Sequence, residues 1–495
     1  MNPRTRIIFR ADGNSQIGLG HVVRSLALAQ MLSHDFECIF AIQAPSHELQ
    51  EQIKKTCEGV IILPACNHDE ERFIHELDAY IAEDVLVVLD GYNFNTTYQQ
   101  SIKRKGCQLF CIDDIHSYTF VADAILNQAG GVDATKYKTA PYTKFLLGPK
   151  FALLRTPFLE AARSERILPA GDVRLFLNLG GADPHNYTLQ IAKDLESIQS
   201  IDQVEIIVGS AYQHLQELKT WLHHNPKYNL HQNLTAEDMR ALMQGCAIAI
   251  TSASGVAYEY ASVSGLLFVL QTADNQEGLY TFLIQNGIAQ KYEQVQQSIN
   301  TDLATAFEQV VATQRQYFDG KSDERLRQVF HNMALATGIS MREATTDDLM
   351  LLFDWANDPE VRKNSFNPNP ILLESHTRWL HTKLEDKQSM LYIAEVSGVP
   401  AAHIRFELLN GKAIISYLIG SDFRGKGLGH MILKKGVAKL LQHQPKLNLI
   451  EGLVQKENIA SIRAFEKAGF SYGTPDSKYP QAHRFELRPE SINQI

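Results

Sequence analysis

Short runs of consecutive apolar residues recur along this chain, and most of them end in a polar or glycine-rich turn. Residues 6–10 form the first run, and residues 22–32 repeat apolar positions at helical spacing. The glycine-rich segment between them ends in Gly20 and His21. A strand, a glycine-rich loop and a helix in this order predict the start of a doubly wound α/β domain, whose ligands lie beyond the carboxyl ends of the strands.

The same pattern continues through the next 250 residues or so. Strand-like runs at 85–89 and 109–112 end in acidic residues, which predicts polar groups at the strand ends. A second α/β half is predicted from about residue 173, with strand-like runs at 175–179, 204–208, 247–250 and 266–270. After the third of these runs, Ser254 and Gly255 open a helix that carries Glu259. Small hydroxyls and N–H groups at a helix start suit a nucleotide diphosphate, and a following carboxylate suits ribose hydroxyls.

Near the C-terminus, the strand-like run 414–419 leads to Arg424-Gly425-Lys426-Gly427-Leu428-Gly429 and then to the helix-like stretch 430–442. Glycines let backbone N–H groups approach an anion, and a helix N-terminus adds partial positive charge in the same direction. The spacing R-x-x-G-x-G fits coenzyme A, and it fits neither the dinucleotide fingerprint nor the P-loop. By itself the loop is equally compatible with a structural glycine turn.

A second motif follows about thirty residues later, Asn458-x-x-Ser461-x-x-x-Phe465-x-Lys467-x-Gly469-Phe470. Together with the opening at 341–349, the two motifs resemble the GNAT acetyltransferase family over about residues 340–495. The resemblance implies a strand four that splays from its neighbour and pairs with the pantetheine amides through Leu418 and Ile419. It also implies that Arg424, Gly425, Lys426, Gly427 and Gly429 hold the pyrophosphate of acetyl-CoA, and that Asn458 contacts the cofactor arm.

The chain departs from this family at one position. Many relatives carry a Tyr where this sequence has Phe465, and the hydroxyl of that Tyr protonates the departing thiolate. Tyr472, Tyr479 or solvent are the substitutes that the sequence leaves open. Glu407, His403 and His430 are candidate bases, although each is more simply a solvated or structural polar residue.

The N-terminal motifs resemble, in order, the UDP-sugar hydrolases of pseudaminic acid biosynthesis, which are relatives of the two-domain GT-B glycosyltransferases. The match spans about residues 5–320 and includes Arg10-Ala11-Asp12-Gly13, Gly18-x-Gly20-His21, Asp90-x-Tyr92, Leu154-Arg155, Gly180-Gly181-x-Asp183-Pro184 and Asn275-Gln276. The family releases UDP from a diacetamido trideoxy-altrose by attack of water at the anomeric carbon, and no metal is expected.

This resemblance implies that His21 is the base or positions the water, beside Asp12, and that Tyr92 lies near the sugar. A helix N-terminus disfavours a charged imidazole, so His21 is expected to stay neutral and able to accept a proton. The residues expected to bind the UDP-sugar are Gly20, Arg155, Gly181, Asp183, Ser254, Gly255, Glu259, Asn275 and Gln276.

Composition adds limits to this interpretation. The chain has 495 residues, 44% of them hydrophobic, and a net charge of −9, which argues against nucleic acid as a partner. No apolar run approaches the ~20 residues of a membrane span, and no signal peptide is recognisable, so a cytoplasmic protein with reduced cysteines is expected. The predicted fold is α/β, a GT-B-like pair of Rossmann-like domains (1–164 and 165–338) followed by a GNAT α+β domain (339–495).

Three hypotheses follow. The first is a bifunctional enzyme that acetylates a UDP-amino-sugar and then removes UDP. The second is a GT-B glycosyltransferase linked to an acetyltransferase of another specificity. The third is a non-catalytic binding role for one half. The sequence leaves the sugar stereochemistry and the oligomeric state open.

Overall fold

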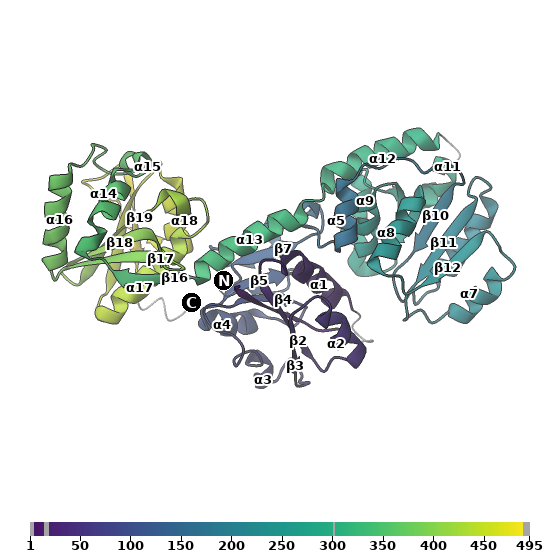
Figure 1. Cartoon of the computed structure of the whole chain (residues 1–495), viewed down its shortest axis with the longest axis horizontal. Helices are drawn as coiled ribbons and strands as arrows, with labels where there is room; N and C mark the ends of the chain where they lie inside the picture. The colour runs from purple at the N-terminus through teal and green to yellow at the C-terminus, as the bar shows by residue number, and fades with distance from the viewer. Residues whose placement is uncertain (1–3, 14–18, 300–301, 489–495) are drawn as a thin grey trace.

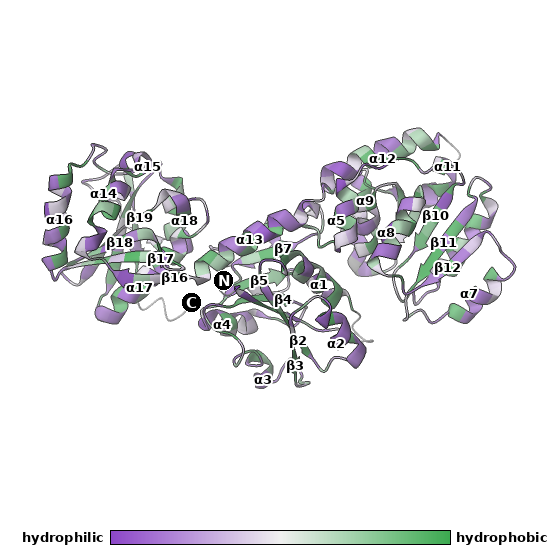
Figure 2. Cartoon of the chain, viewed as in Figure 1, coloured by the Kyte–Doolittle hydropathy of each residue, from purple (hydrophilic) through white to green (hydrophobic). Residues whose placement is uncertain are grey.

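Three large sheets follow one another along the chain in the computed structural model, which describes residues 4–13, 19–299 and 302–488 (Figure 1). Strands are mostly hydrophobic, whereas the outward faces of the helices around them are polar (Figure 2). Within those described ranges, the structure contains no helix that combines the length and apolarity needed to cross a bilayer.

The first sheet has seven parallel strands in the order β3-β2-β1-β4-β5-β7-β9. Its strands are β1 (Arg6–Ala11), β2 (Glu37–Gln43), β3 (Gly59–Leu63), β4 (Leu86–Asp90), β5 (Gln108–Ile112), β7 (Ala124–Asn127) and β9 (Lys144–Leu147). The associated elements are α1 (Gly20–Leu32), α2 (His47–Lys54), α3 (Glu71–Ile74), α4 (Thr96–Arg104) and a small pair of strands, β6 (Thr119–Phe120) and β8 (Lys138–Thr139). The strand order reverses between β1 and β4, and ligands of such sheets bind in the crevice at that point.

The second sheet has six parallel strands in the order β12-β11-β10-β13-β14-β15. Its strands are β10 (Arg174–Asn178), β11 (Gln203–Val208), β12 (Tyr228–Gln232), β13 (Ile248–Ser252), β14 (Leu266–Leu270) and β15 (Gln290–Lys291). Its helices are α6 (Tyr187–Asp194), α7 (Leu215–Leu222), α8 (Ala236–Gly245), α9 (Gly255–Val263), α10 (Glu277–Gln285), α11 (Val295–Ile299) and α12 (Leu303–Tyr317). The order reverses between β10 and β13, so the architecture of the first sheet is repeated.

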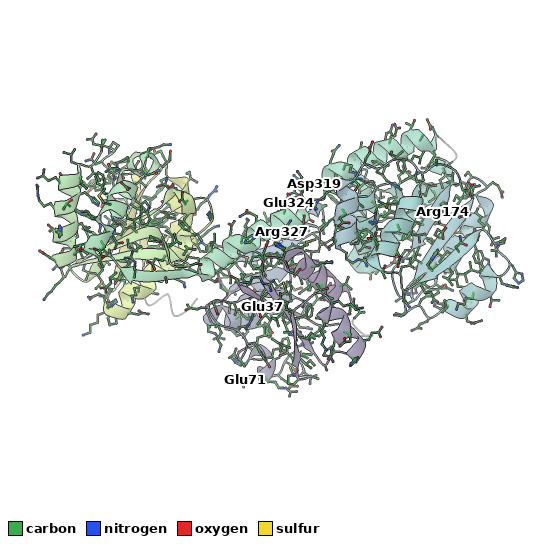
Figure 3. The ribbon with its side chains drawn as sticks, in the orientation of Figure 1. Glu37, Glu71, Arg174, Asp319, Glu324 and Arg327 are labelled. Carbon is green, nitrogen blue, oxygen red and sulfur yellow. The ribbon has the colours of Figure 1, made fainter. Side chains whose placement is uncertain are left out.

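Two helices connect these sheets. Helix α5 (Thr156–Arg163) leads from the first sheet to the second, and α13 (Ser322–Thr337) returns to the first. Phe330 of α13 is buried, with ring centroids 6.3 Å from Phe36 and 4.8 Å from Phe110. Helix α13 lies within the range expected for the second half, yet it packs against the first sheet. Figure 3 labels Glu324 and Arg327 along this returning segment.

The third sheet has seven strands in the order β16-β17-β18-β19-β20-β22-β21, and only its β19–β20 pair is parallel. Its strands are β16 (Ile339–Glu343), β17 (Ser389–Val396), β18 (Val399–Leu409), β19 (Lys412–Ile419), β20 (Leu449–Gln455), β21 (Ser471–Tyr472) and β22 (Ala482–Leu487). Its helices are α14 (Leu349–Asn357), α15 (Pro359–Lys363), α16 (Leu373–Glu385), α17 (Gly429–His443) and α18 (Ile459–Lys467). This part is the α+β unit expected after about residue 339.

Candidate active sites

A buried carboxylate lies where the strand order of the first sheet reverses. Asp90, the last residue of β4, is fully buried and accepts hydrogen bonds from His21 Nδ1 at 2.7 Å and Ser25 Oγ at 3.1 Å. Arg24 donates to both carboxylate oxygens, from Nε at 2.7 Å and from Nη2 at 2.6 Å. Burial opposes ionisation of Asp90, but the charge of Arg24 and the hydrogen bonds from His21 and Arg24 outweigh it and lower the pKa of this carboxyl.

The contact with Asp90 sets the orientation of the His21 ring. With its proton on Nδ1 and donated to Asp90, the imidazole presents Nε2 as its acceptor. Arg24 Nη2 lies 3.1 Å from the same Nδ1, because both groups donate to Oδ1 of Asp90. The side chain of His21 is 15% exposed at the start of α1, so its outer nitrogen can reach a bound water or substrate. A base held by a buried carboxylate is the arrangement used in hydrolytic dyads and triads.

Tyr92 and Asp114 complete this group of side chains. The Tyr92 ring meets the His21 ring edge to face at 4.7 Å. Burial first, and then the charge of Asp114, raise the pKa of Tyr92 to about 12, so its hydroxyl keeps its proton at neutral pH. Arg24 Nη1 lies 2.8 Å from Asp114 Oδ2. We call His21, Arg24, Asp90, Tyr92 and Asp114 the Asp90 cluster.

The sequence singled out two members of the Asp90 cluster, His21 and Tyr92, as site residues. Asp90 and Asp114 were noted as polar residues at strand ends and as members of family motifs, but not as site residues, and Arg24 was missed. The signal for Arg24 was its position three residues after His21, which places both on one face of α1.

Asp12 has different partners. It lies 2.6 Å from Nη1 of the fully buried Arg10 and accepts a hydrogen bond from the backbone N–H of Gln43 at 3.0 Å. The described contacts of Asp12 therefore tie the end of β1 to β2 and do not include His21. A catalytic role for Asp12 stays a prediction. Gly20, where α1 begins, has open space around it, and Gly18 lies outside the described residues.

Arg155 and Glu259, both expected to bind UDP, lie against each other. Arg155 precedes α5, and it donates from Nε and Nη2 to the two oxygens of Glu259 on α9 at 2.8 and 2.9 Å. Burial raises the pKa of Glu259, although Arg155 opposes this effect. A ribose that binds Glu259 would share these oxygens with the guanidinium or replace it.

Two other predicted UDP-binding residues, Gly181 and Asp183, lie at turns of the second sheet. A Cβ added to Gly209 would lie 2.7 Å from the carbonyl oxygen of Gly181, so the turns after β10 and β11 are in contact. Asp183 accepts from the backbone N–H groups of Tyr187 and Thr188 at 3.0 and 2.7 Å. These bonds satisfy N–H groups in the first turn of α6, and UDP binding by Asp183 stays a prediction.

The start of α9, a predicted anion site of the second half, is unobstructed. The helix begins at Gly255, where an added Cβ would meet nothing within 4 Å, and the hydroxyls of Ser252 and Ser254 lie 3.0 Å apart beside it. Gln276 Oε1 accepts from Thr272 N–H at 2.8 Å. The side chain of Asn275 lies outside the described residues.

In the third sheet, β19 and β20 separate as the sequence motifs implied. Their last paired residues are Ile415 and Gly452, whereas β19 stays paired with β18 as far as Ile419. The backbone of Leu418 and Ile419 therefore lies beyond the point where β19 parts from β20. The predicted splay is confirmed, and pairing of this backbone with pantetheine remains a prediction.

The glycine loop after β19 has the geometry of an anion cradle. Gly425 and Gly427 have φ of +74° and +77° with open space at their Cα atoms, and α17 begins at Gly429. Arg424 donates from Nε to Ile419 O at 2.8 Å and pairs through Nη1 with Asp358 at 2.8 Å. Its Nη2 is buried without a partner among the described residues.

The other predicted cofactor contacts are Lys426, within this loop, and Asn458, at the start of α18 (Ile459–Lys467). Lys426 Nζ lies 5.3 Å from the centre of the Phe423 ring. Asn458 Oδ1 accepts from the N–H of Ser461 at 3.1 Å and so caps α18. The described role of Asn458 is thus to fix the start of this helix.

Among the tyrosines considered as acids, Tyr472 donates to Glu466 at 2.8 Å and Tyr479 packs on Phe366 at 4.5 Å. Phe465 is buried, and the ring of Tyr417 lies 5.9 Å from it. Tyr417 donates to Ser461 Oγ at 3.2 Å, and burial raises the pKa of its hydroxyl to about 12. Sequence reasoning missed Tyr417, whose only signal was its place in the strand before the glycine loop.

The three candidate bases differ in accessibility. Glu407 pairs with Lys383 at 3.2 Å and Arg405 at 3.4 Å. Burial lowers the pKa of His430 to about 4, and its Nδ1 lies 3.0 Å from Gly427 O. His403 is buried, and burial lowers the pKa of this imidazole to about 3.

All six cysteines have free thiols, and Cys66 is the one that is partly exposed. Within residues 4–13, 19–299 and 302–488 there is no group of three or more His, Cys, Asp or Glu side chains placed to hold a metal ion.

Comparisons with known proteins match two regions of this chain to two different kinds of protein. Residues 339–471 match the family model for the acetyltransferase (GNAT) domain. The chain is 23% identical over 486 residues to an uncharacterised protein of Methanocaldococcus jannaschii, covering 94% of this chain and 96% of that protein. It is 26% identical over 295 residues to the UDP-2,4-diacetamido-2,4,6-trideoxy-beta-L-altropyranose hydrolase of Campylobacter jejuni, covering 58% of this chain and 99% of that protein.

A further match lies in the C-terminal region. The chain is 25% identical over 158 residues to an aminoglycoside N(6′)-acetyltransferase of Klebsiella pneumoniae, covering 28% of this chain and 78% of that protein. The C-terminal region is a GNAT domain, and the preceding region is similar to the hydrolase. The expected fold class is confirmed, with two parallel sheets before a GNAT fold, and the match supports acetyl-CoA as co-substrate.

Because His403 is buried, we expect the folding stability of the third sheet to fall at acidic pH. Burial, Arg405 and His376 lower the pKa of His403 from 6.5 to about 3, against a raising contribution from Asp348. Above pH 6.5 neither the folded nor the unfolded chain protonates this ring. As pH falls from 6.5 towards 3, only the unfolded chain takes up the proton, so stability is lost by up to a few kcal/mol.

We therefore expect His403→Leu to flatten the loss of unfolding free energy between pH 6.5 and 4, measured by denaturant titration with tryptophan fluorescence. The exposed His381 on α16 provides the matched control, since His381→Leu should leave the wild-type pH dependence intact. Equal pH dependence in all three proteins would contradict the assignment.

Proposed function

We propose that this chain is a bifunctional enzyme of pseudaminic acid biosynthesis. The GNAT domain transfers acetyl from acetyl-CoA to the 4-amino group of a UDP-4-amino-4,6-dideoxy-N-acetyl-altrosamine. The two preceding sheets then hydrolyse UDP-2,4-diacetamido-2,4,6-trideoxy-beta-L-altropyranose to the free sugar and UDP. The hydrolase function is supported by the His21–Asp90 pair, which lies where the strand order of the first sheet reverses. The region that contains this pair is similar to a UDP-2,4-diacetamido-2,4,6-trideoxy-beta-L-altropyranose hydrolase.

In the hydrolytic step, water attacks the anomeric carbon of the sugar and the bond to the UDP oxygen breaks. His21 Nε2 accepts a proton from this water, and Asp90 stabilises the imidazolium that forms. Tyr92, packed on the His21 ring, faces the sugar. The open start of α9 holds the departing diphosphate, because its N–H groups and helix dipole favour negative charge.

In the acetyl transfer, the neutral amine attacks the thioester carbonyl carbon, the carbon–sulfur bond breaks and the amine loses a proton. The Arg424–Gly429 loop binds the pyrophosphate, and the splayed backbone at Leu418 and Ile419 orients the pantetheine arm. Tyr417 is the buried hydroxyl that protonates the departing thiolate, in the place that Phe465 cannot fill. The similarity to an aminoglycoside N-acetyltransferase supports an amino sugar as the acceptor.

We also propose a cytoplasmic location for the enzyme. The experiment that tests the whole proposal supplies the UDP-4-amino-sugar and acetyl-CoA without any acceptor, and follows products by mass spectrometry and NMR. A hydrolase yields the diacetamido sugar and UDP. A GT-B glycosyltransferase stops at the acetylated UDP-sugar, and that result would refute the hydrolytic half.

His21→Ala should lower UDP release by about 10²–10⁴-fold, because a general base contributes a factor of this size. Acetyl transfer should stay near wild type, since it occurs on a different sheet. The rates are measured by separate assays for UDP and coenzyme A. His34→Ala is the control, because His34 lies at the surface after α1 with its side chain 90% exposed. If His21→Ala kept most of the hydrolase activity, His21 would not be the general base.

Gly427→Val should abolish acetyl-CoA binding, because a β-branched side chain would occupy the open space in which the pyrophosphate meets backbone N–H groups. Gly411→Val is a matched control: Gly411 also has positive φ, +77°, with open space, but it lies in the β18–β19 turn. Calorimetry should detect binding to the control and none to Gly427→Val. Unchanged affinity in Gly427→Val would make the loop purely structural.

The hydrolase should prefer the sugar that already carries the 4-acetamido group. A pocket shaped for a neutral acetamido group would have to desolvate a free ammonium without a partner, which costs more than a missing methylene. Pre-acetylated substrate should restore UDP release even in Gly427→Val, and the 4-amino substrate without acetyl-CoA should give little. Comparable kcat/KM values for the two substrates would refute this order of steps.

A further inference from the structure

The GNAT domain does not stand apart from the first sheet. Tyr142, in the loop that leads to β9, is buried, and its ring stacks on His430 of α17 at 6.2 Å with an interplanar angle of 10°. Lys434, one turn further along α17, lies with Nζ 4.3 Å from the centre of the same ring. Lys435 also approaches Glu83 at 3.7 Å. The helix that follows the glycine loop therefore rests on the first sheet.

Positively charged side chains gather where the GNAT domain meets the domain of the first sheet. Arg463 and Lys467 lie one turn apart on α18. Lys144, at the start of β9, follows three residues after Pro141, which lines a surface hollow together with Arg463 and Lys467. Burial, Arg463 and Lys144 together lower the pKa of Lys467. Like charges brought together in this way cost free energy, which a bound anion would recover.

The carboxylates nearby are already engaged. Asp123 accepts from Lys103 at 2.5 Å and from the backbone N–H of Leu109 at 2.7 Å. Glu466 accepts from the hydroxyl of Tyr472 at 2.8 Å. Neither is a described ion-pair partner of Arg463 or Lys467. The hydroxyl of Tyr472 does not neutralise Glu466, so one negative charge stands against the three positive charges of Lys144, Arg463 and Lys467, which we call the cationic group.

A surface hollow lies at this cationic group, lined by residues of both parts: Pro141, Arg463, Glu466, Lys467, Phe470 and Tyr472. It is next to the glycine loop, because a Cβ on Gly429 would lie 3.1 Å from Cβ of Ala464, the residue after Arg463. A ligand whose pyrophosphate occupies the loop thus reaches the hollow within one turn of α18. Coenzyme A carries, beyond its pyrophosphate, a ribose with a 3′-phosphate.

We infer that Lys144 of the first sheet joins Arg463 and Lys467 in binding the 3′-phosphate of coenzyme A, so that the hydrolase half completes the cofactor site of the GNAT domain. This inference rests on the proposed acetyltransferase function. It adds that the cofactor is bound by two separately folded parts and that its 3′-phosphate is recognised by a residue outside the GNAT domain.

The test compares coenzyme A with 3′-dephospho-coenzyme A by calorimetry on the full chain. Wild type should bind coenzyme A roughly tenfold more tightly, and Lys144→Glu should bring that ratio close to one while leaving dephospho-coenzyme A affinity unchanged. Lys467→Glu should act in the same direction from the GNAT side. Lys150→Glu makes the same charge change at an exposed residue whose carbonyl contacts Arg325, at the opposite end of α13 from the GNAT domain, and should behave as wild type.

Equal wild-type affinity for the two compounds would overturn the 3′-phosphate site and leave the acetyltransferase proposal intact. An equal loss for both compounds in Lys144→Glu would also overturn it, because the residue would then act on the fold and not on the phosphate. Absence of binding of either compound to wild type would overturn the acetyltransferase function as well.

Discussion

The ionised Asp90 at the end of β4 organises the candidate active site of the first sheet. A carboxylate removed from water costs several kcal/mol unless cations and hydrogen bonds compensate it. Here His21, Arg24 and Ser25, all on α1, supply that compensation, so the buried charge binds this helix to the end of β4. Arg24 extends the same network to Asp114 after β5. The orientation of the His21 ring, on which the proposed base role depends, is thus a consequence of stabilising a buried charge.

The sequence predicted the fold well wherever the pattern was local. Strand-like runs ending in polar turns located β4, β5, β10 and β13, and the glycine spacing after β19 located an open loop with positive φ at Gly425 and Gly427. These features depend on neighbouring residues and on the conformational freedom of glycine, both of which can be read from the chain.

What the sequence did not predict depends on contacts between distant residues. Asp12 was expected beside His21, but its described partners are Arg10 and the backbone N–H of Gln43. Helix α13 follows the second sheet in sequence and packs on the first, since Phe330 fits between Phe36 and Phe110. Tyr417 became a candidate acid only when the structure placed it beside Phe465.

The two proposed reactions make opposite demands on water, which is a physical reason for two sites in one chain. Water is the reactant at the anomeric carbon, so the Asp90 cluster has to admit and orient it. The thioester must be shielded from water, because hydrolysis would waste acetyl-CoA. A single pocket cannot meet both demands. Helix α13 connects the two parts of the chain that carry the proposed sites. It packs on the first sheet, and Gly338 is the single residue between it and β16 of the GNAT domain. The sites are therefore separated by their own sheets yet joined by a short, well-packed connection.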